Sequence, residues 1–270
     1  MDLLPLVIIG LFVGLVGGMF GVGGGIVLIP ALNEVLGPNQ HLYQSTAMIV
    51  NLFVAVPAVY QHHCVRAVNV GVVLRMVPWA IASVVGGVAV SELGIFEGKG
   101  EAYLRGLFGL FLLTCAAYDI YRLRRKTDTA GLAPDGTPAR PRWERLAAIA
   151  IPTGFSSGLL GIGGGILAVP LQRRLLHTPI RTAIANSAAL IIATSFVGAL
   201  AKNYAVMSDV ENSMEPILLA LVLIPTAVVG SLVGSRFTHR VPVQLVKGGF
   251  NLLLLLASVR LTYSAFRSLP

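Results

Sequence analysis

Long apolar segments, interrupted by glycine clusters and short polar stretches, dominate the chain. Six of them, at 46–61, 70–90, 102–121, 182–201, 216–235 and 248–266, approach the roughly 20 residues that a helix needs to cross a bilayer. Two further apolar segments, at 3–36 and 146–176, contain glycine clusters near their middle. The alternating pattern of a membrane β-barrel is absent from the sequence. The pattern therefore predicts an all-α integral membrane protein.

The two glycine clusters are copies of one motif. Residues 14–30 read GLVGGMFGVGGGIVLIP and residues 154–170 read GFSSGLLGIGGGILAVP, with most glycines and the final proline in register. The match extends further, since Pro78 corresponds to Pro225. The sequence thus predicts a duplicated unit, in which a glycine-broken segment is followed by three transmembrane helices. Breaks that recur in corresponding hydrophobic segments point to the binding site of a secondary transporter.

A polar stretch divides the chain into two halves. Residues 122–145 are rich in arginine, proline and glycine and have no apolar periodicity. We interpret them as a cytoplasmic linker between repeat one, residues 1–121, and repeat two, residues 146–270. Length and class together predict a single transmembrane transporter domain over residues 1–270.

The composition supports a membrane environment. The chain is 55% hydrophobic and 12% charged, which is about half the charge density of a soluble domain. In a soluble protein the net charge of +8 would suggest a nucleic-acid partner. In so apolar a chain it indicates cytoplasmic loops rich in Lys and Arg, so we expect a lipid bilayer and no nucleic acid as the surroundings.

The distribution of Lys and Arg selects a topology. With the linker in the cytoplasm, one crossing by each of the eight segments leaves 12 of the 20 basic residues inside, whereas re-entrant hairpins at the two broken segments leave 15 inside. The positive-inside rule therefore favours the hairpins. A hairpin plus three single crossings reverses the orientation of the next unit. The fold is accordingly predicted to be an inverted-topology repeat whose glycine tips enter from opposite faces.

The broken segments have chemistry that suits an anion. Each cluster precedes an apolar half-helix, whose start exposes backbone N–H groups and about half a positive charge. Glycine lets an anion approach the backbone without obstruction by a β-carbon, although close helix packing is an alternative role for such residues. The candidate substrate-binding glycines are Gly21, Gly23, Gly24 and Gly25 in the first cluster and Gly161, Gly163, Gly164 and Gly165 in the second.

Neutral polar side chains follow each break. Ser45, Thr46 and Asn51 come after the first, and Asn186 and Ser187 come after the second. Their hydroxyl and amide groups can donate hydrogen bonds to an oxyanion without carrying charge, so we expect them to bind substrate. The alternative is that Ser and Thr bond back to their own helices.

Other polar residues carry weaker signals. Arg75 is expected to attract an anion at the cytoplasmic mouth, with positive-inside anchoring as the alternative. His62, His63 and Cys64 lack further ligands at zinc spacing, so neither a metal site nor a cofactor is predicted. Lys202 lies near the end of a span, where snorkelling explains it. No acidic residue lies clearly at mid-membrane, so coupling to protons is not visible in the sequence.

The duplicated GxxxGxxGxGGGxxxxP segments, each followed by a short stretch containing Ser or Thr, resemble the TauE/SafE sulfite exporter family, also called the TSUP family. The resemblance covers nearly the whole chain. It implies a multi-pass protein in the inner (plasma) membrane of a bacterium or archaeon. It also implies a substrate among small sulfur-containing anions, such as sulfite, sulfonates, thiosulfate or sulfate, with export as the usual direction.

An exporter that works by alternating access at the two breaks is the leading interpretation, and a passive anion channel of the same fold is the alternative. A membrane-embedded hydrolase is a third, because residues 154–158 match the G-x-S-x-G pattern. The motif lies in an apolar helix without acid and base partners, and Val16 replaces Ser156 in the first copy, so we expect no enzyme. The sequence leaves the particular anion, the direction, the coupling ion and the oligomeric state open.

Overall fold

The computed structural model describes residues 3–37, 39–93, 141–207 and 215–268, together with Leu110, Leu113, Thr114, Ala117 and Tyr121. The described residues are helical and contain no strand. Most of the span predicted at 102–121 and of the linker predicted at 122–145 lies outside them.

Each repeat begins with two helices that flank a glycine break. In the first, α1 (Leu3–Phe20) and α2 (Gly25–Leu36) are followed by α3 (Gln40–Cys64) and α4 (Val70–Ser91). In the second, α6 (Trp143–Leu160) and α7 (Gly165–Leu175) are followed by α8 (Ile180–Met207), α9 (Glu215–Arg240) and α10 (Val243–Ser268).

Within the described part of the chain, six helices are long and apolar enough to cross a membrane: α1, α3, α4, α8, α9 and α10. The prediction of an all-helical, multi-pass membrane protein is therefore confirmed. The first arm of the first broken segment, α1, is itself long enough to span. Re-entry of the broken segments and their insertion from opposite faces of the bilayer stay predictions.

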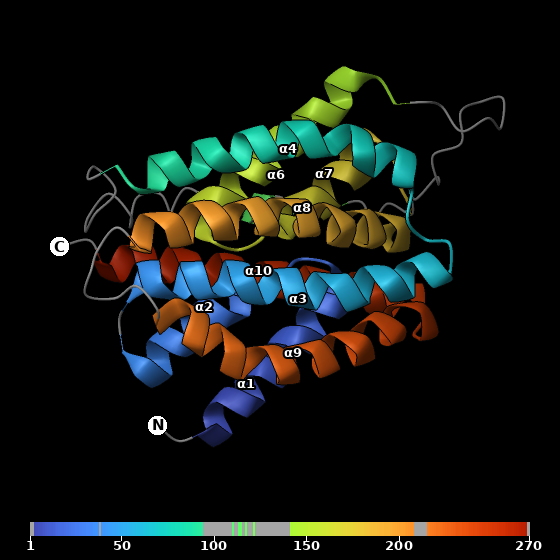
Figure 1. Ribbon diagram of the computed structural model, residues 1–270. Coiled ribbons are helices and arrows are strands. Elements are labelled where there is room, and N and C mark those ends of the chain that lie inside the picture. Colours follow the sequence, from blue (N-terminus) through green and yellow to red (C-terminus); the bar gives the residue numbers. More distant parts are fainter. Residues whose placement is uncertain are drawn as a thin grey trace, which may run out of the picture.

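The two repeats are interlocked. Figure 1 shows α4, α8, α3 and α9 side by side in that order across the molecule, and each neighbouring pair in this row is in contact. The broken segments pack on the row crosswise, because α1 lies against α9 of the second repeat and α6 lies against α4 of the first. Each half therefore supplies the packing surface for the break of the other half.

Small residues allow these helices to approach closely. A β-carbon at Gly14 would overlap the backbone of Ala227 in α9, and one at Gly154 would overlap the backbone of Ala80 in α4. The four positions correspond between the repeats, so the same contact is made twice with the partners exchanged. Because lipid is as apolar as leucine, such close packing, rather than burial of apolar surface, is what holds membrane helices together.

The apolar core surrounds both breaks. Val22 and Ile162, which stand between the first two glycines of each GxGGG cluster, are buried in one hydrophobic cluster. The Phe20 ring, at the end of α1, meets Phe250 of α10 with 6.2 Å between centroids. The break is thus anchored by apolar side chains on either side of its glycines.

We expect Gly14→Ala and Gly154→Ala each to lower the stability of the detergent-purified protein, by about 1–3 kcal/mol, because the added methyl overpacks a helix contact. Thermal unfolding followed by tryptophan fluorescence or size-exclusion chromatography measures the change. Gly86→Ala is the matched control, since a β-carbon there meets nothing within 4 Å. Equal destabilisation by all three variants would contradict this account of the packing.

Candidate functional site

The two glycine breaks contact one another in the buried interior. A β-carbon at Gly25 would lie 2.8 Å from the carbonyl oxygen of Gly161, and one at Gly165 would overlap the carbonyl oxygen of Gly21. The two contacts are reciprocal. In addition, a β-carbon at Gly23 would lie 2.6 Å from the Ile162 carbonyl oxygen. Each break therefore requires glycine in the other, and the structure brings the two predicted clusters together.

The backbone conformation also requires glycine at these positions. Four glycines, two in each break, have equivalent positive φ angles of 60°, 79°, 69° and 86°: Gly21, Gly23, Gly161 and Gly163. Residues with a β-carbon rarely adopt this region. The breaks differ at the next position, where Gly164 has a φ of 76° and Gly24 has a φ of −80°. The start of α7 is thus shaped differently from the start of α2.

Asn51 of α3 lies between the two breaks. Its Oδ1 atom accepts hydrogen bonds from the backbone N–H groups of Gly24, at 2.6 Å, and Gly25, at 3.0 Å. These donors fix the orientation of the carboxamide, so its Nδ2 group faces the second break and is 3.5 Å from the Gly161 carbonyl oxygen. Asn51 therefore caps the first half-helix with its acceptor and presents its donor to the second.

The corresponding place at the second break holds Ile191. A β-carbon at Gly165 would lie 2.7 Å from Ile191 Cδ1, and one at Gly163 would lie 3.6 Å from its Cγ2. An isoleucine offers no acceptor. Among the described side chains, none accepts a hydrogen bond from the N–H groups of Gly164 or Gly165. The positive end of α7 thus lacks the cap that α2 has.

A buried hydroxyl accompanies the second break. Ser157 of α6 is fully buried, and its Oγ atom has no hydrogen-bond partner among the described residues. Its Cβ atom would lie 3.1 Å from a β-carbon at Gly164. An unpaired buried hydroxyl is costly, so the Ser157 hydroxyl is a candidate to bond to a ligand. The sequence interpretation considered only the neighbouring Ser156, whose Oγ bonds back to the Thr153 carbonyl oxygen at 3.0 Å.

Ser187 of α8 holds the two breaks together. Its Oγ atom is 2.6 Å from the Gly21 carbonyl oxygen and 3.3 Å from the Gly165 carbonyl oxygen. Thr194 Oγ1, two turns further along the same helix, is 3.3 Å from the Gly163 carbonyl oxygen and 3.2 Å from the carbonyl oxygens of Leu190 and Ile191 in its own helix. Ser187 thus supplies a side-chain donor to the buried, non-helical backbone of the breaks.

Three other residues that were predicted to bind substrate, Ser45, Thr46 and Asn186, make no described hydrogen bond to the glycine breaks. Thr46 Oγ1 donates to the Leu42 carbonyl oxygen at 2.9 Å, which is the bond back to its own helix. Asn186 Nδ2 donates to Gln172 Oε1 of α7 at 3.0 Å. Ser45 is buried on α3. These residues connect or fill the helices around the breaks rather than bonding to them.

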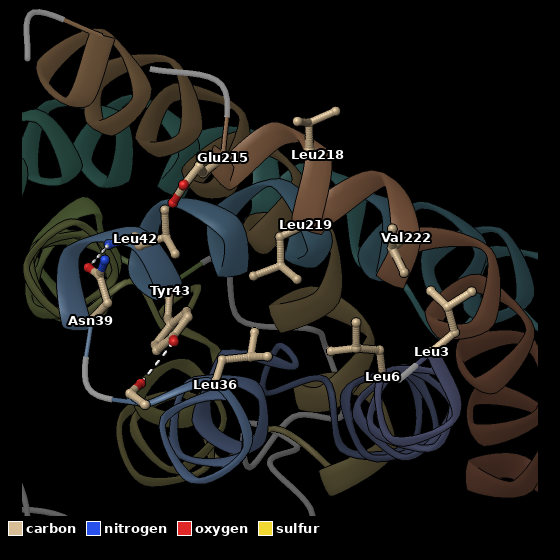
Figure 2. A pocket seen from close by; sticks show the side chains of 11 residues that line it. Leu3, Leu6, Leu36, Asn39, Leu42, Tyr43, Glu215, Leu218, Leu219 and Val222 are labelled. Carbon is tan, nitrogen blue, oxygen red and sulfur yellow. Dashed lines mark hydrogen bonds between the residues drawn. The ribbon is translucent and has the colours of Figure 1, made fainter. Parts of the chain in front are cut away.

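A cavity of about 540 Å³ lies where the first turns of α1, α3 and α9 meet the end of α2. Figure 2 shows leucines lining most of its wall, with the Glu215 carboxylate on one side. The Tyr43 hydroxyl also lines it and donates to the Gly37 carbonyl oxygen at 2.8 Å.

A second cavity, of about 340 Å³, occupies the corresponding place in the other repeat, between α4 and α6. Trp143 and Leu146 stand there in register with Leu3 and Leu6 of the first cavity. Arg75 lines the second cavity at the position that Val222 has in the first, so it lies away from the breaks. A basic residue, Arg75, thus lines one cavity and an acidic residue, Glu215, lines the other.

Lys202 is not a snorkelling residue, so that interpretation is wrong. Its side chain is 1% exposed, and its Nζ atom donates to Gln44 Oε1 at 2.7 Å and to Ser91 Oγ at 3.1 Å. The aliphatic part of Gln44 packs against the second break, since its Cβ would lie 2.7 Å from a β-carbon at Gly161. The sequence could not reveal this, because the partners come from α3 and α4.

The fold and the site define a class of protein: a polytopic helical membrane protein in which two discontinuous helices meet in the interior, as in many secondary transporters. The sequence profile of the family described as "Sulfite exporter TauE/SafE" matches residues 6–261. The chain belongs to this family, and it is a multi-pass helical membrane protein.

Similar proteins come from bacteria and archaea. The chain is 30% identical to the probable membrane transporter protein MamO of Magnetospirillum gryphiswaldense over 92% of its own length and 43% of that relative. It is 26% identical to the probable membrane transporter protein YunE of Bacillus subtilis over 99% of its length and 100% of the relative. It is 28% identical to the probable membrane transporter protein MJ0441 of Methanocaldococcus jannaschii over 73% of its length. The chain spans about two fifths of the length of the MamO relatives. No solved structure matches it.

We expect Ser187→Ala to destabilise the protein by about 1–3 kcal/mol, because it removes the donor from two buried break carbonyls. Chemical or thermal unfolding of the purified protein checks this expectation. Ser195→Ala is the control on the same helix, since the buried Ser195 hydroxyl has no described partner to lose. A larger loss for Ser195→Ala than for Ser187→Ala would contradict the proposed stabilisation.

Proposed function

We propose that the chain transports small sulfur-containing anions, such as sulfite, sulfonates, thiosulfate or sulfate, by alternating access at the two glycine breaks. The observation that carries the proposal is the asymmetry of the breaks. Asn51 already occupies the donors of α2, whereas the start of α7 lacks such an acceptor and lies beside the unpaired Ser157 hydroxyl. The anion is therefore assigned to the second break.

The chemistry of the interior favours an anion over a cation. The groups that face the second break are hydrogen-bond donors: the Asn51 carboxamide N–H₂ and the Ser157 hydroxyl, together with the backbone at the start of α7. No Asp or Glu is among the buried residues of the described chain, so a bound cation would find no counter-charge. The helix terminus adds roughly half a positive charge without the desolvation cost of a buried Lys or Arg.

The shape of the donor set favours oxyanions with several oxygen atoms. Donors from α3, α6 and α7 converge from different directions, so a tetrahedral or pyramidal anion can engage several of them at once. The sulfur-containing class comes from the family, whose description names sulfite. Among the previously predicted residues, Gly163, Gly164, Gly165 and Asn51 are the ones proposed to contact the substrate directly. The first-break glycines and Ser187 hold the site in shape.

The two cavities are proposed as the opposite mouths of the pathway. They occupy corresponding places in the two repeats, and in an inverted repeat such places face opposite sides of the membrane. Arg75 would attract an anion at the cytoplasmic mouth, whereas Glu215 at the other mouth would favour its release. Transport direction is thus biased by charges at the mouths rather than by the central site.

We expect Ser157→Ala to weaken anion transport, raising the half-saturating concentration about tenfold for the loss of one hydrogen bond to a charged ligand. Counterflow of radiolabelled sulfate, thiosulfate and methanesulfonate in proteoliposomes measures this. Ser156→Ala is the matched control and should behave as wild type, because the Ser156 hydroxyl bonds to its own helix. Loss of activity in Ser156→Ala alone would instead support a hydrolase. Flux without trans-stimulated exchange would support a channel.

We expect Asn51→Asp to abolish anion binding while the fold persists. The carboxylate keeps the acceptor for Gly24 and Gly25, but it replaces the donor that faces the second break with a negative charge. Thermal-shift binding of sulfite, sulfate and sulfonates provides the measurement. Asn69→Asp is the control, because Asn69 caps α4 in the same way, accepting from Val72 N–H at 3.2 Å, and is exposed. Undiminished binding by Asn51→Asp would remove the anion from this site.

A further inference from the structure

Two histidines from distant parts of the chain meet at the ends of α3 and α9. His62 Nδ1 and His239 Nε2 are 2.7 Å apart, and the rings meet edge to face with 4.9 Å between centroids. His62 is fully buried, whereas His239 is half-buried. Both lie at the ends of spans predicted to face the cytoplasm. A buried ionisable pair inside a membrane protein needs a functional explanation.

The pair adjoins the first glycine break. The backbone of Gly18 in α1 lies next to the His62 ring. Thr238, the residue before His239, donates through Oγ1 to the Met19 carbonyl oxygen at 2.6 Å. Gly18 and Met19 form the last turns of α1 just before the break at Gly21. The pair is therefore in contact with the end of α1 that leads into the first break.

The charge that faces the pair from a neighbouring helix is Arg181 of α8, which acts on His239. Its Nε and NH2 atoms donate to the carbonyl oxygens of Thr238, at 3.1 Å, and Val241, at 2.6 Å. The neighbouring helix α1 presents its uncharged backbone at Gly18. The surroundings thus disfavour a second positive charge on the pair.

The geometry limits the pair to one added proton. A hydrogen bond between two ring nitrogens needs one proton between them, which is present when both rings are neutral and when one ring is cationic. A second added proton would set two N–H groups against each other at 2.7 Å and separate the rings. The half-buried His239 is the point of entry for this proton. The two rings titrate as a unit.

A metal ion is a poorer occupant than a proton. No third His, Cys, Asp or Glu joins the two rings to form a metal-binding group in the described part of the chain. The ring nitrogens already bond to each other, and the Arg181 guanidinium repels a divalent cation. A proton needs no further ligand.

We propose that the His62–His239 pair is the proton-binding site that couples anion movement to proton movement. The inference rests on the proposed transport function. One proton binds per cycle, and its positive charge then lies beside the C-terminal end of α1, next to the first break. Coupling that is invisible in the sequence thus arises from two helix ends brought together by the fold.

The test uses the full chain in proteoliposomes, with sulfate and methanesulfonate as probes, because neither anion changes its charge over the pH range of the assay. Two fluxes are compared: net accumulation driven by a pH gradient, and counterflow at equal pH. We expect the wild type to perform both. His62→Gln and His239→Gln should lose gradient-driven accumulation but retain counterflow, because exchange needs no net proton transfer. A purely structural pair would lose both fluxes together.

His63→Gln is the matched control, since His63 is the exposed neighbour of His62 on the same helix and should keep both fluxes. Anion accumulation on either side of the membrane in the wild type supports coupling. The side depends only on whether the anion and the proton move together or in exchange. Counterflow with no gradient-driven accumulation in the wild type overturns the coupling site and leaves the proposed function intact.

A second measurement is independent of flux. Histidine ¹⁵N resonances of the purified wild type, recorded with sulfate present, should report uptake of a single proton shared by two rings, and the signature should vanish in either Gln variant. Absence of counterflow for every sulfur anion would reject the proposed function. If the resonances still show uptake of one proton in that case, the His62–His239 pair remains a proton-binding site. If they show none, the proton site is rejected together with the proposed function.

Discussion

Non-helical backbone in a bilayer survives only where protein buries it, and here each glycine break is buried by the other. The carbonyl oxygens of Gly21 and Gly161 occupy the space that a β-carbon at Gly165 or Gly25 would need. This reciprocal contact dictates glycine in both clusters. It also dictates the crosswise packing of the helices. Because α1 packs on α9 and α6 packs on α4, each break lies against helices of the other repeat, where the two breaks can meet. The Ser187 hydroxyl lies within hydrogen-bond distance of a carbonyl oxygen of each break and so links the two breaks.

Within this nearly symmetric frame, the chemistry is asymmetric. Asn51 and Ile191 stand at corresponding places beside the two breaks, yet one caps a half-helix and the other offers only methyl groups. One helix start is therefore capped, and the other, which also differs in backbone conformation at Gly164, has no side-chain acceptor among the described residues. Duplication supplies two similar halves, and the side chain beside each break differs between them. Arg75 in one cavity and Glu215 in the other are a second difference between the halves.

Polar contacts between helices follow the same logic. Lys202 joins α8 to α3 and α4 through Gln44 and Ser91, and His62 joins α3 to α9 through His239. In an apolar environment such groups must find partners or be expelled. Both groups of polar side chains lie next to a glycine break. Lys202 bonds to Gln44, which packs against the second break, and His62 lies beside the end of α1, which leads into the first break. The polar interior of the protein is therefore concentrated around the breaks.

The sequence by itself determined the helical membrane class, the described helices to within six residues at either end, the duplicated glycine motif and the family, because hydrophobic length, glycine conformation and motif spacing are local properties of the chain. It also predicted that the two breaks form one site; the structure shows that they are in contact, and the shared site stays a prediction. Only the tertiary structure decided that Asn51 caps α2, that Ser157 rather than Ser156 has a free hydroxyl at the second break, that Thr46 and Asn186 bond elsewhere, and that Lys202 and His62 are buried. Each of these contacts depends on which atoms of a helix far away in the sequence lie opposite a side chain. The pattern of residues along the sequence does not specify such pairings.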